Sequence, residues 1–201
     1  MPRIGVLALQ GDVAEHARMV AAVGGEPVEV RTPAALAMVD GLIIPGGESP
    51  TIGKLLTRSG LHEAIPARVR AGMPVYGTCA GMILLAAEAS GGEPPLLRLM
   101  DIAVARNAYG RQRESFEAWL SVPAIDPAPF RIAFIRAPIV TRIGTGVQVH
   151  ASFEGHPVLV QQDRVLVSSF HPELTGYAGI HRYFHMLVTG GATRDREVQR
   201  T

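Results

Sequence analysis

Short apolar runs alternate with amphipathic stretches through the first half of the chain. Residues 4–9, 27–30 and 41–44 are apolar runs of strand length, whereas residues 13–23 carry apolar side chains at helical spacing up to Gly24-Gly25. Strands that alternate with helices in this way build a mostly parallel sheet that is covered on both faces. The pattern therefore predicts an α/β fold of three layers, with the sheet in the middle.

The pattern changes near residue 101. Short strand-like runs then follow one another, at residues 119–122, 131–135, 148–153, 158–161 and 165–169. We interpret these runs as an antiparallel extension that carries residue 171 back toward residue 79. A last helix is expected near residues 179–188.

Length and composition favour one domain. The chain has 201 residues, of which 47% are hydrophobic, and this is enough to bury one large core. We predict a single domain over residues 1–190. Residues 191–201 are predicted to be a polar, frayed tail.

Charge and cysteine content exclude several classes of function. The formal net charge is +1, from 19 basic and 18 acidic residues, and no Lys/Arg-rich block suggests a nucleic-acid partner. No apolar stretch approaches the roughly 18 residues that a membrane span needs. One cysteine cannot form an internal disulfide, and the first apolar run is too short for a signal-peptide core. We therefore expect a cytoplasmic, reducing setting.

The only cysteine, Cys79, lies in the turn Gly77-Thr78-Cys79-Ala80-Gly81 between two apolar runs. This context predicts a strand, a sharp turn and a helix, the arrangement that exposes a nucleophile. Glycines on both sides remove Cβ atoms that would clash, and the start of the helix favours thiolate over thiol. Because a lone cysteine is often a small buried hydrophobe, the turn alone leaves a structural role open.

A second motif favours the reactive interpretation. Residues 165–170 predict a strand that runs into His171-Pro172-Glu173. In an extended segment alternate side chains share a face, so His171 and Glu173 are expected to point the same way, and Pro172 biases His171 toward that conformation. An imidazole held by a carboxylate is the base that a cysteine nucleophile needs.

A glycine turn is expected at the same edge of the sheet. Gly46-Gly47 follows the predicted strand 41–44, and Ser49 is expected to cap a helix with Pro50 at its first position. Ligand crevices in open α/β sheets lie beyond the C-terminal ends of the strands. The chemistry of this chain is therefore expected between this turn and Cys79.

These segments together resemble the class I (triad) glutamine amidotransferases, whose nucleophile turn and His-x-Glu pair they match. Within that class the narrower likeness is to the glutaminase subunits of pyridoxal 5′-phosphate synthase, and it runs from Ile4 to about Thr189. It is carried by an ordered set of segments: residues 5–11, 45–49, Arg106-Asn107, 110–112, 115–117, 135–138 and 169–175.

The resemblance implies a flavodoxin-like amidotransferase fold and hydrolysis of L-glutamine to L-glutamate and ammonia. Cys79 is then the nucleophile that forms a γ-glutamyl thioester, His171 the base that later protonates the leaving nitrogen, and Glu173 the group that orients His171. The backbone N–H groups of Gly47 and Ala80 are expected to form the oxyanion hole.

The resemblance also implies a set of glutamine-binding residues, because the matching positions contact glutamine in related subunits. An arginine fork suits the α-carboxylate of glutamine, although the sequence does not say which arginine binds it. The expected residues are Gly47, Glu48, Ser49, Arg106, Ile135 and Arg136.

A glutaminase of this size has no second site at which ammonia could be used, so a partner synthase is predicted. The resemblance implies that the partner is the (β/α)₈-barrel subunit that builds pyridoxal 5′-phosphate, in a 12:12 assembly. We expect the contact face to include residues 10–16 and loops around the active site.

No metal or cofactor is predicted. Residues 47–54 approach a phosphate-binding loop, but the glycine spacing is one residue too long and Leu55 stands where Ser or Thr is required. His181 and His185 would share a helix face, yet Arg182 stands where a zinc protease has Glu. Other histidines without a neighbouring motif are assigned no role: His16, His62, His150 and His156.

Three alternatives stay open at the level of sequence. The chain could serve another synthase, such as imidazole glycerol phosphate synthase, although segments 106–107 and 135–136 argue against it. It could be a stand-alone cysteine hydrolase or peptidase on a related fold. It could also be an interaction subunit with an inactive nucleophile turn.

Overall fold

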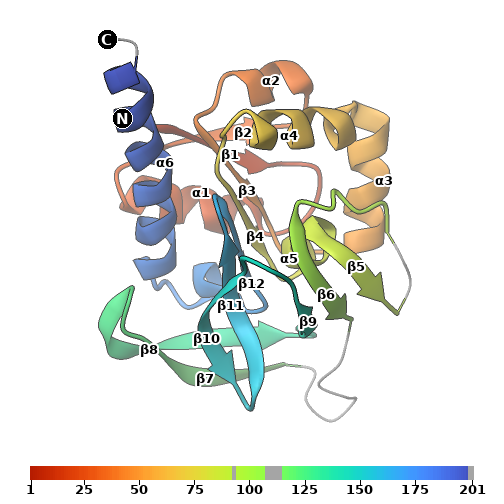
Figure 1. The fold of residues 1–201 in the computed structure, drawn as a ribbon, viewed down its shortest axis with the longest axis vertical. Helices are drawn as coiled ribbons and strands as arrows, with labels where there is room; N and C mark the ends of the chain where they lie inside the picture. The colour runs from red at the N-terminus through yellow and green to blue at the C-terminus, as the bar shows by residue number, and fades with distance from the viewer. Residues whose placement is uncertain (92–93, 107–114, 199–201) are drawn as a thin grey trace.

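A seven-stranded sheet forms the centre of the molecule (Figure 1). The computed structural model describes residues 1–91, 94–106 and 115–198. Five strands are parallel, in the order β2-β1-β3-β4-β12, and two antiparallel strands extend the sheet beyond β12. The parallel part has the flavodoxin strand order. The sheet strands are β1 (Arg3–Leu7), β2 (Glu26–Val30), β3 (Gly41–Ile44), β4 (Val75–Thr78), β10 (Gln148–Phe153), β11 (His156–Gln162) and β12 (Val165–Ser168).

Helices cover both faces of this sheet (Figure 1). On β3, Leu42 and Ile44 belong to one apolar cluster and Ile43 to another, because successive side chains of a strand point to opposite faces. The cluster with Ile43 contains residues of α1 (Val13–Ala22) and α6 (Gly179–Val198). The other cluster contains residues of α2 (Pro33–Ala37), α3 (Ser49–Ser59), α4 (Leu61–Arg70) and α5 (Ala80–Leu85). The predicted three-layer α/β fold is thus confirmed.

Two smaller sheets flank the C-terminal edge of the central one. One is three-stranded, from β5 (Ala86–Ser90), β6 (Met100–Ala105) and β9 (Ile139–Ile143). The other is the hairpin of β7 (Ser115–Val122) and β8 (Asp126–Ile135). Its apolar residues, Phe130 and Phe134 among them, join the cluster under α1 and α6. The hairpin is therefore anchored to the main core.

The prediction for β12 was wrong in one respect. The sequence predicted that residues 165–169 belong to an antiparallel extension, whereas β12 pairs in parallel with β4 inside the central sheet. All residues of β12 are buried. An unbroken apolar run of this kind is typical of a parallel strand covered on both faces. Only β10 and β11 extend the sheet in antiparallel fashion.

The ends of two helices also differ from the prediction. Helix α3 begins at Ser49, with Glu48 rather than Ser49 as its N-cap. Helix α6 runs to Val198 instead of ending near Val188, and Gly190 lies inside it without a positive φ. A glycine disfavours a helix by only about 1 kcal/mol and ends it mainly where a left-handed cap forms. None of the described helices is long and apolar enough to cross a membrane.

Helix α5 approaches β3 so closely that only glycine fits at position 81. A Cβ atom on Gly81 would lie 2.2 Å from the carbonyl oxygen of Ile44. We expect Gly81→Ala to lower the free energy of unfolding by about 2 kcal/mol, because backbone rather than a flexible side chain must move. Chemical denaturation measures this change.

The matched control is Gly190→Ala, the same substitution at a helical glycine that has nothing within 4 Å of the added Cβ. This variant should be more stable than the wild type by about 0.5–1 kcal/mol, through helix propensity alone. A Gly81→Ala protein as stable as Gly190→Ala would contradict the close approach.

Candidate active site

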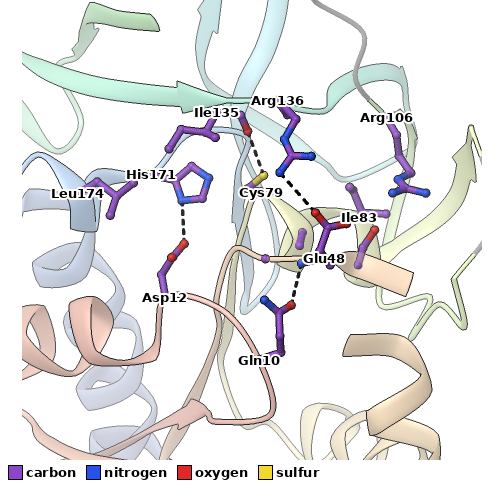
Figure 2. A pocket seen from close by; sticks show the side chains of 13 residues that line it. Gln10, Asp12, Glu48, Cys79, Ile83, Arg106, Ile135, Arg136, His171 and Leu174 are labelled. Carbon is purple, nitrogen blue, oxygen red and sulfur yellow. Dashed lines mark hydrogen bonds and ion pairs between the residues drawn. The ribbon is translucent and has the colours of Figure 1, made fainter. Parts of the chain in front are cut away.

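Loops from the C-terminal ends of β1, β3, β4 and β12 converge on one pocket of about 320 Å³. Figure 2 shows the side chains that line it. This is the edge at which open α/β sheets bind ligands. The lining residues are Gln10, Asp12, Gly47, Glu48, Ser49, Cys79, Ala80, Ile83, Arg106, Ile135, Arg136, His171 and Leu174.

Cys79 occupies a strained turn between β4 and α5, as its sequence context predicted. Its φ of 48° and ψ of −100° are unusual for a residue with a side chain. Its N–H donates to the carbonyl of Ser168 (2.8 Å), so the turn is tied to β12. Cys79 is 8% exposed, and its Sγ lies 3.7 Å from the carbonyl oxygen of Ile135 (Figure 2). The sulfur therefore faces the pocket from a fixed position.

His171 follows β12 and is held at both its backbone and its ring. Its N–H donates to the carbonyl of Ala133 on β8 (2.8 Å), and Nδ1 lies 2.7 Å from Oε1 of Glu173. The expected pairing of this imidazole and this carboxylate is present, but the predicted reason was wrong. Pro172–Leu174 is a 3₁₀ turn rather than extended chain, since proline suits the first position of a helical turn as well as a strand.

The charges around this pair favour the imidazolium. Burial alone would lower the pKa of His171, but hydrogen bonds to Asp12, Cys79 and Glu173 raise the pKa of His171 to about 12. Desolvation raises the pKa of Glu173, whose side chain is completely buried, and the bond to His171 opposes that rise. The proton is thus held between the two groups, and the ring is positively charged at neutral pH.

Asp12 is a second carboxylate on the same ring nitrogen, and sequence reasoning missed it. Its Oδ2 lies 3.4 Å from His171 Nδ1 (Figure 2). Asp12 is the N-cap residue of α1, yet its side chain makes no capping hydrogen bond. The only sequence signal was its place just beyond the first strand, next to the turn Gln10-Gly11.

The Gly46-Gly47 turn lies against the loop after β1. The carbonyl of Gly46 accepts from the N–H of Asp12 (3.2 Å), and the N–H of Glu48 donates to Oε1 of Gln10 (2.8 Å). Gly47 has a φ of +155°, and a Cβ there would lie 2.6 Å from Gln10 Oε1. The turn is therefore fixed where a glycine is required, beside Cys79.

The predicted glutamine-binding residues form the rim of the pocket. Arg136 extends toward Glu48, with 3.4 Å between Nη2 and Oε1, and both side chains are more than half exposed. Arg106 donates to the carbonyl of Gly91 at 3.2 Å. The structure therefore brings together Gly47, Glu48, Ser49, Arg106, Ile135 and Arg136 around Cys79. Asn107 and residues 110–112 of the family likeness lie outside the described residues.

Glu173 does not line the pocket but lies behind His171, next to a buried polar layer. His16 of α1 is 3.5 Å from Glu173 Oε1, through its Nε2. The same Nε2 lies 3.1 Å from Oγ1 of Thr78, and His16 Nδ1 lies 2.9 Å from Nε2 of His181. Sequence reasoning assigned neither histidine a role, because no local motif connects residues so far apart in the chain.

Three potential metal ligands gather at the centre of the site. One atom each of Asp12, His171 and Glu173 lies within 4.8 Å of the others. Both carboxylates contact the same imidazole nitrogen, so charge pairing with His171 accounts for the cluster. The prediction that the chain needs no metal stays a prediction.

Comparison with known proteins places this chain in one family. The model of the SNO glutamine amidotransferase family matches residues 6–189. Pyridoxal 5′-phosphate synthase subunit PdxT of Pelotomaculum thermopropionicum is 54% identical over 182 residues, which are 90% of this chain and 93% of the relative. The subunit of the same name from Niallia circulans is 53% identical over 90% of this chain and 95% of its own.

Solved structures of glutamine amidotransferases have the same fold as this chain. A crystal structure of a glutamine amidotransferase is 48% identical, covers 92% of this chain and 98% of its own, and superposes with a TM-score of 0.88. The PurLQS structure from Thermotoga maritima is 17% identical with a TM-score of 0.69, and it covers 95% of this chain and 99% of its own. At that identity the likeness concerns the fold alone.

The contact of Asp12 with His171 predicts a titration effect. Asp12→Asn removes a negative charge from Nδ1, so we expect the pKa of His171 to fall by about one unit or more from its value near 12. The imidazolium should then lose its proton at lower pH than in the wild type. NMR titration of the ring nitrogens measures the shift.

Glu15→Gln is the control for this experiment, because it removes the same charge from the same helix where the side chain pairs with Arg18 instead. It should leave the titration of His171 nearly unchanged. If Asp12→Asn also left the titration unchanged, the contact with Asp12 would not influence the ring.

Proposed function

The chain belongs to the SNO glutamine amidotransferase family, and on that basis we propose that it is a glutaminase that supplies ammonia to a pyridoxal 5′-phosphate synthase. Relatives that are 54% identical over about nine tenths of both chains carry the name of that synthase. One observation carries the proposed chemistry. His171 Nδ1 lies 2.7 Å from the buried Glu173 Oε1, beside the pocket that also contains strained Cys79.

The proposed first step is attack of the Cys79 sulfur on the side-chain amide carbon of L-glutamine. The backbone N–H groups of Ala80, which begins α5, and of Gly47 would then stabilise the negative oxygen of the tetrahedral intermediate. Both residues line the same pocket as the thiol. Collapse of the intermediate breaks the C–N bond and leaves a γ-glutamyl thioester.

His171 would supply the proton that ammonia takes as it leaves. The ring is already protonated at neutral pH, since its pKa is raised to about 12 by Asp12, Cys79 and Glu173 against the effect of burial. Acylation removes the charge of the sulfur and with it one cause of that high pKa. The ring has given its proton to ammonia and is now neutral, so it can act as the base that takes a proton from the water that cleaves the thioester to glutamate.

Substrate recognition is proposed to rest on the rim of the pocket. Arg106 and Arg136 would offer guanidinium groups to the α-carboxylate, and Glu48 would offer a carboxylate to the α-amino group. Arg136 Nη2 lies 3.4 Å from Glu48 Oε1. When glutamine binds, this ion pair would open, and each side chain would contact the group of opposite charge on the substrate. Ser49 and the carbonyl of Ile135 complete the set near Cys79.

The proposed partner is the (β/α)₈-barrel synthase subunit, in a 12:12 assembly in the cytoplasm. The family likeness supports this assignment, as does the protonation of free ammonia in water to unreactive ammonium. The N-terminal part of α1 and the preceding loop, from Gln10 to His16, would lie at the contact through their exposed residues, since the side chain of His16 itself is buried. Gln10 and Asp12 also line the pocket, so this loop is placed to connect the partner with the active site.

The test is release of glutamate from L-glutamine with and without the synthase subunit. Wild-type protein should be feebly active alone and more active with the synthase. Cys79→Ala should lower kcat by about a thousandfold or more in the complex, because no other group replaces the nucleophile. A glutamine-like affinity label should add to Cys79 of the wild type in a 1:1 ratio, measured by mass spectrometry.

His171→Ala should also lower kcat strongly, because it removes the proton donor of the proposed reaction, and His150→Ala serves as its control. His150 is a half-buried histidine that lies 3.0 Å from Gln161 Oε1, away from the pocket, so its loss should leave glutamate release nearly intact. Retained turnover in Cys79→Ala would exclude the assigned nucleophile. Activation by a different synthase, but not by the pyridoxal 5′-phosphate synthase subunit, would exclude the assigned partner.

A further inference from the structure

Behind the His171–Glu173 pair lie two buried histidines that the proposed reaction does not use. They are His181 on α6 and His16 on α1, and they form a row that ends at the carboxylate of Glu173. The side chains of His16 and Glu173 are completely buried, and His181 is 1% exposed. Burying two histidines in a core is unfavourable unless their ring nitrogens have partners. This row therefore calls for an explanation.

One tautomer of His16 suits these contacts. An ionised carboxylate only accepts, so a proton on Nε2 of His16 presents an N–H to Glu173 Oε1 at 3.5 Å, beside the shorter contact of Nε2 with Thr78 Oγ1 at 3.1 Å. In the other tautomer a lone pair would face the carboxylate and repel it. His16 Nδ1 is then an acceptor, and Nε2–H of His181 donates to it over 2.9 Å. The N–H groups along the row thus point toward Glu173.

We propose that His16 is a positioning residue for the His171–Glu173 pair: its Nε2–H, shared with Thr78, holds Glu173 ionised and turned toward His171, and His181 fixes the tautomer of His16 that makes this contact possible. The inference deepens the proposed function and rests on it for its role in turnover.

The need for such a donor follows from the surroundings of Glu173. Its Oε2 has no hydrogen-bonding partner within the described part of the chain. Desolvation raises the pKa of Glu173, so without donors the carboxyl group would take up a proton and lose its hold on the imidazolium. A neutral N–H dipole helps here without adding a competing charge.

Both histidines of the row are neutral. Burial lowers the pKa of His16 well below 6.5, helped by the nearby His181 and His171, and burial lowers the pKa of His181 to about 3. The titratable groups that face His16 come from every element around it: His181, His171, Glu173 and Tyr76, whose ring centre lies 6.4 Å from that of His16. His16 therefore acts through hydrogen-bond direction rather than charge.

The test measures how the reactivity of Cys79 and the turnover of glutamine depend on pH. His16→Leu removes the donor, so Glu173 stays protonated to higher pH and His171, with less support from it, loses its own proton at lower pH. The cysteine thiolate that the imidazolium stabilises is then formed only at higher pH. We expect the acid midpoint of Cys79 alkylation by iodoacetamide to rise by about one pH unit, and alkylation at neutral pH to slow about tenfold. The acid limb of kcat/KM for L-glutamine, measured with the synthase subunit, should shift in the same direction.

His16→Gln is the rescue variant, because its amide N–H can replace Nε2–H, and it should restore most of the wild-type profile. His62→Leu is the matched control: His62 on α4 is a part-buried histidine bonded to the carbonyl of Leu96 (3.2 Å), and its loss should leave both profiles in place. If His16→Leu does not fold, His181→Leu is measured in its place, and the acid midpoint of Cys79 alkylation should again rise.

The outcomes separate this inference from the proposed function. If the wild type released no glutamate with the synthase subunit but the alkylation shifts appeared, the proposed function would fail and the role of His16 would stand. If the wild type were active and His16→Leu kept the wild-type midpoint, or if His16→Gln were as impaired as His16→Leu, the inference would be overturned.

Discussion

The hydrogen bond between the imidazole of His171 and the buried carboxylate of Glu173 is the interaction on which the site depends. A carboxylate with no exposed surface is unstable in the charged form unless donors surround it. Here the imidazolium supplies one donor, and the charge on the ring is in turn stabilised by Asp12 and by Cys79. Each of these groups needs the others, so the site is one electrostatic unit rather than a set of independent residues.

The fold brings this unit together by placing four loops at one edge of a parallel sheet. β4 and β12 are neighbours, so the residues that follow them, Cys79 and His171, leave the sheet side by side. The loop after β1 contributes Asp12, and the loop after β3 contributes Gly47. The strained backbone of Cys79 is maintained by a hydrogen bond to Ser168 and by a helix that begins one residue later. Packing of the sheet thus compensates for the local strain.

The features that sequence could predict are those with local causes. The turn around Cys79 and the His-x-Glu motif combine residue type with short spacing, and the structure places both at the expected edge. The roles of Asp12, His16 and His181 could not be predicted, because their partners lie on other elements and no local pattern reports them. The parallel pairing of β12 was missed because short apolar runs fit several sheet arrangements, and α6 was cut short because a glycine pair resembles a helix end.

Strand β8 contacts both reacting groups. The carbonyl of Ala133 receives the N–H of His171, and the carbonyl of Ile135 faces the sulfur of Cys79. These carbonyls are two residues apart on one strand, so they point in the same direction. A single hairpin outside the central sheet, β7–β8, therefore contacts both groups and helps to set the distance between the thiol and the imidazole. A slip of that hairpin by one residue would turn both carbonyls away together, so nucleophile and base would lose their alignment in one event rather than by degrees.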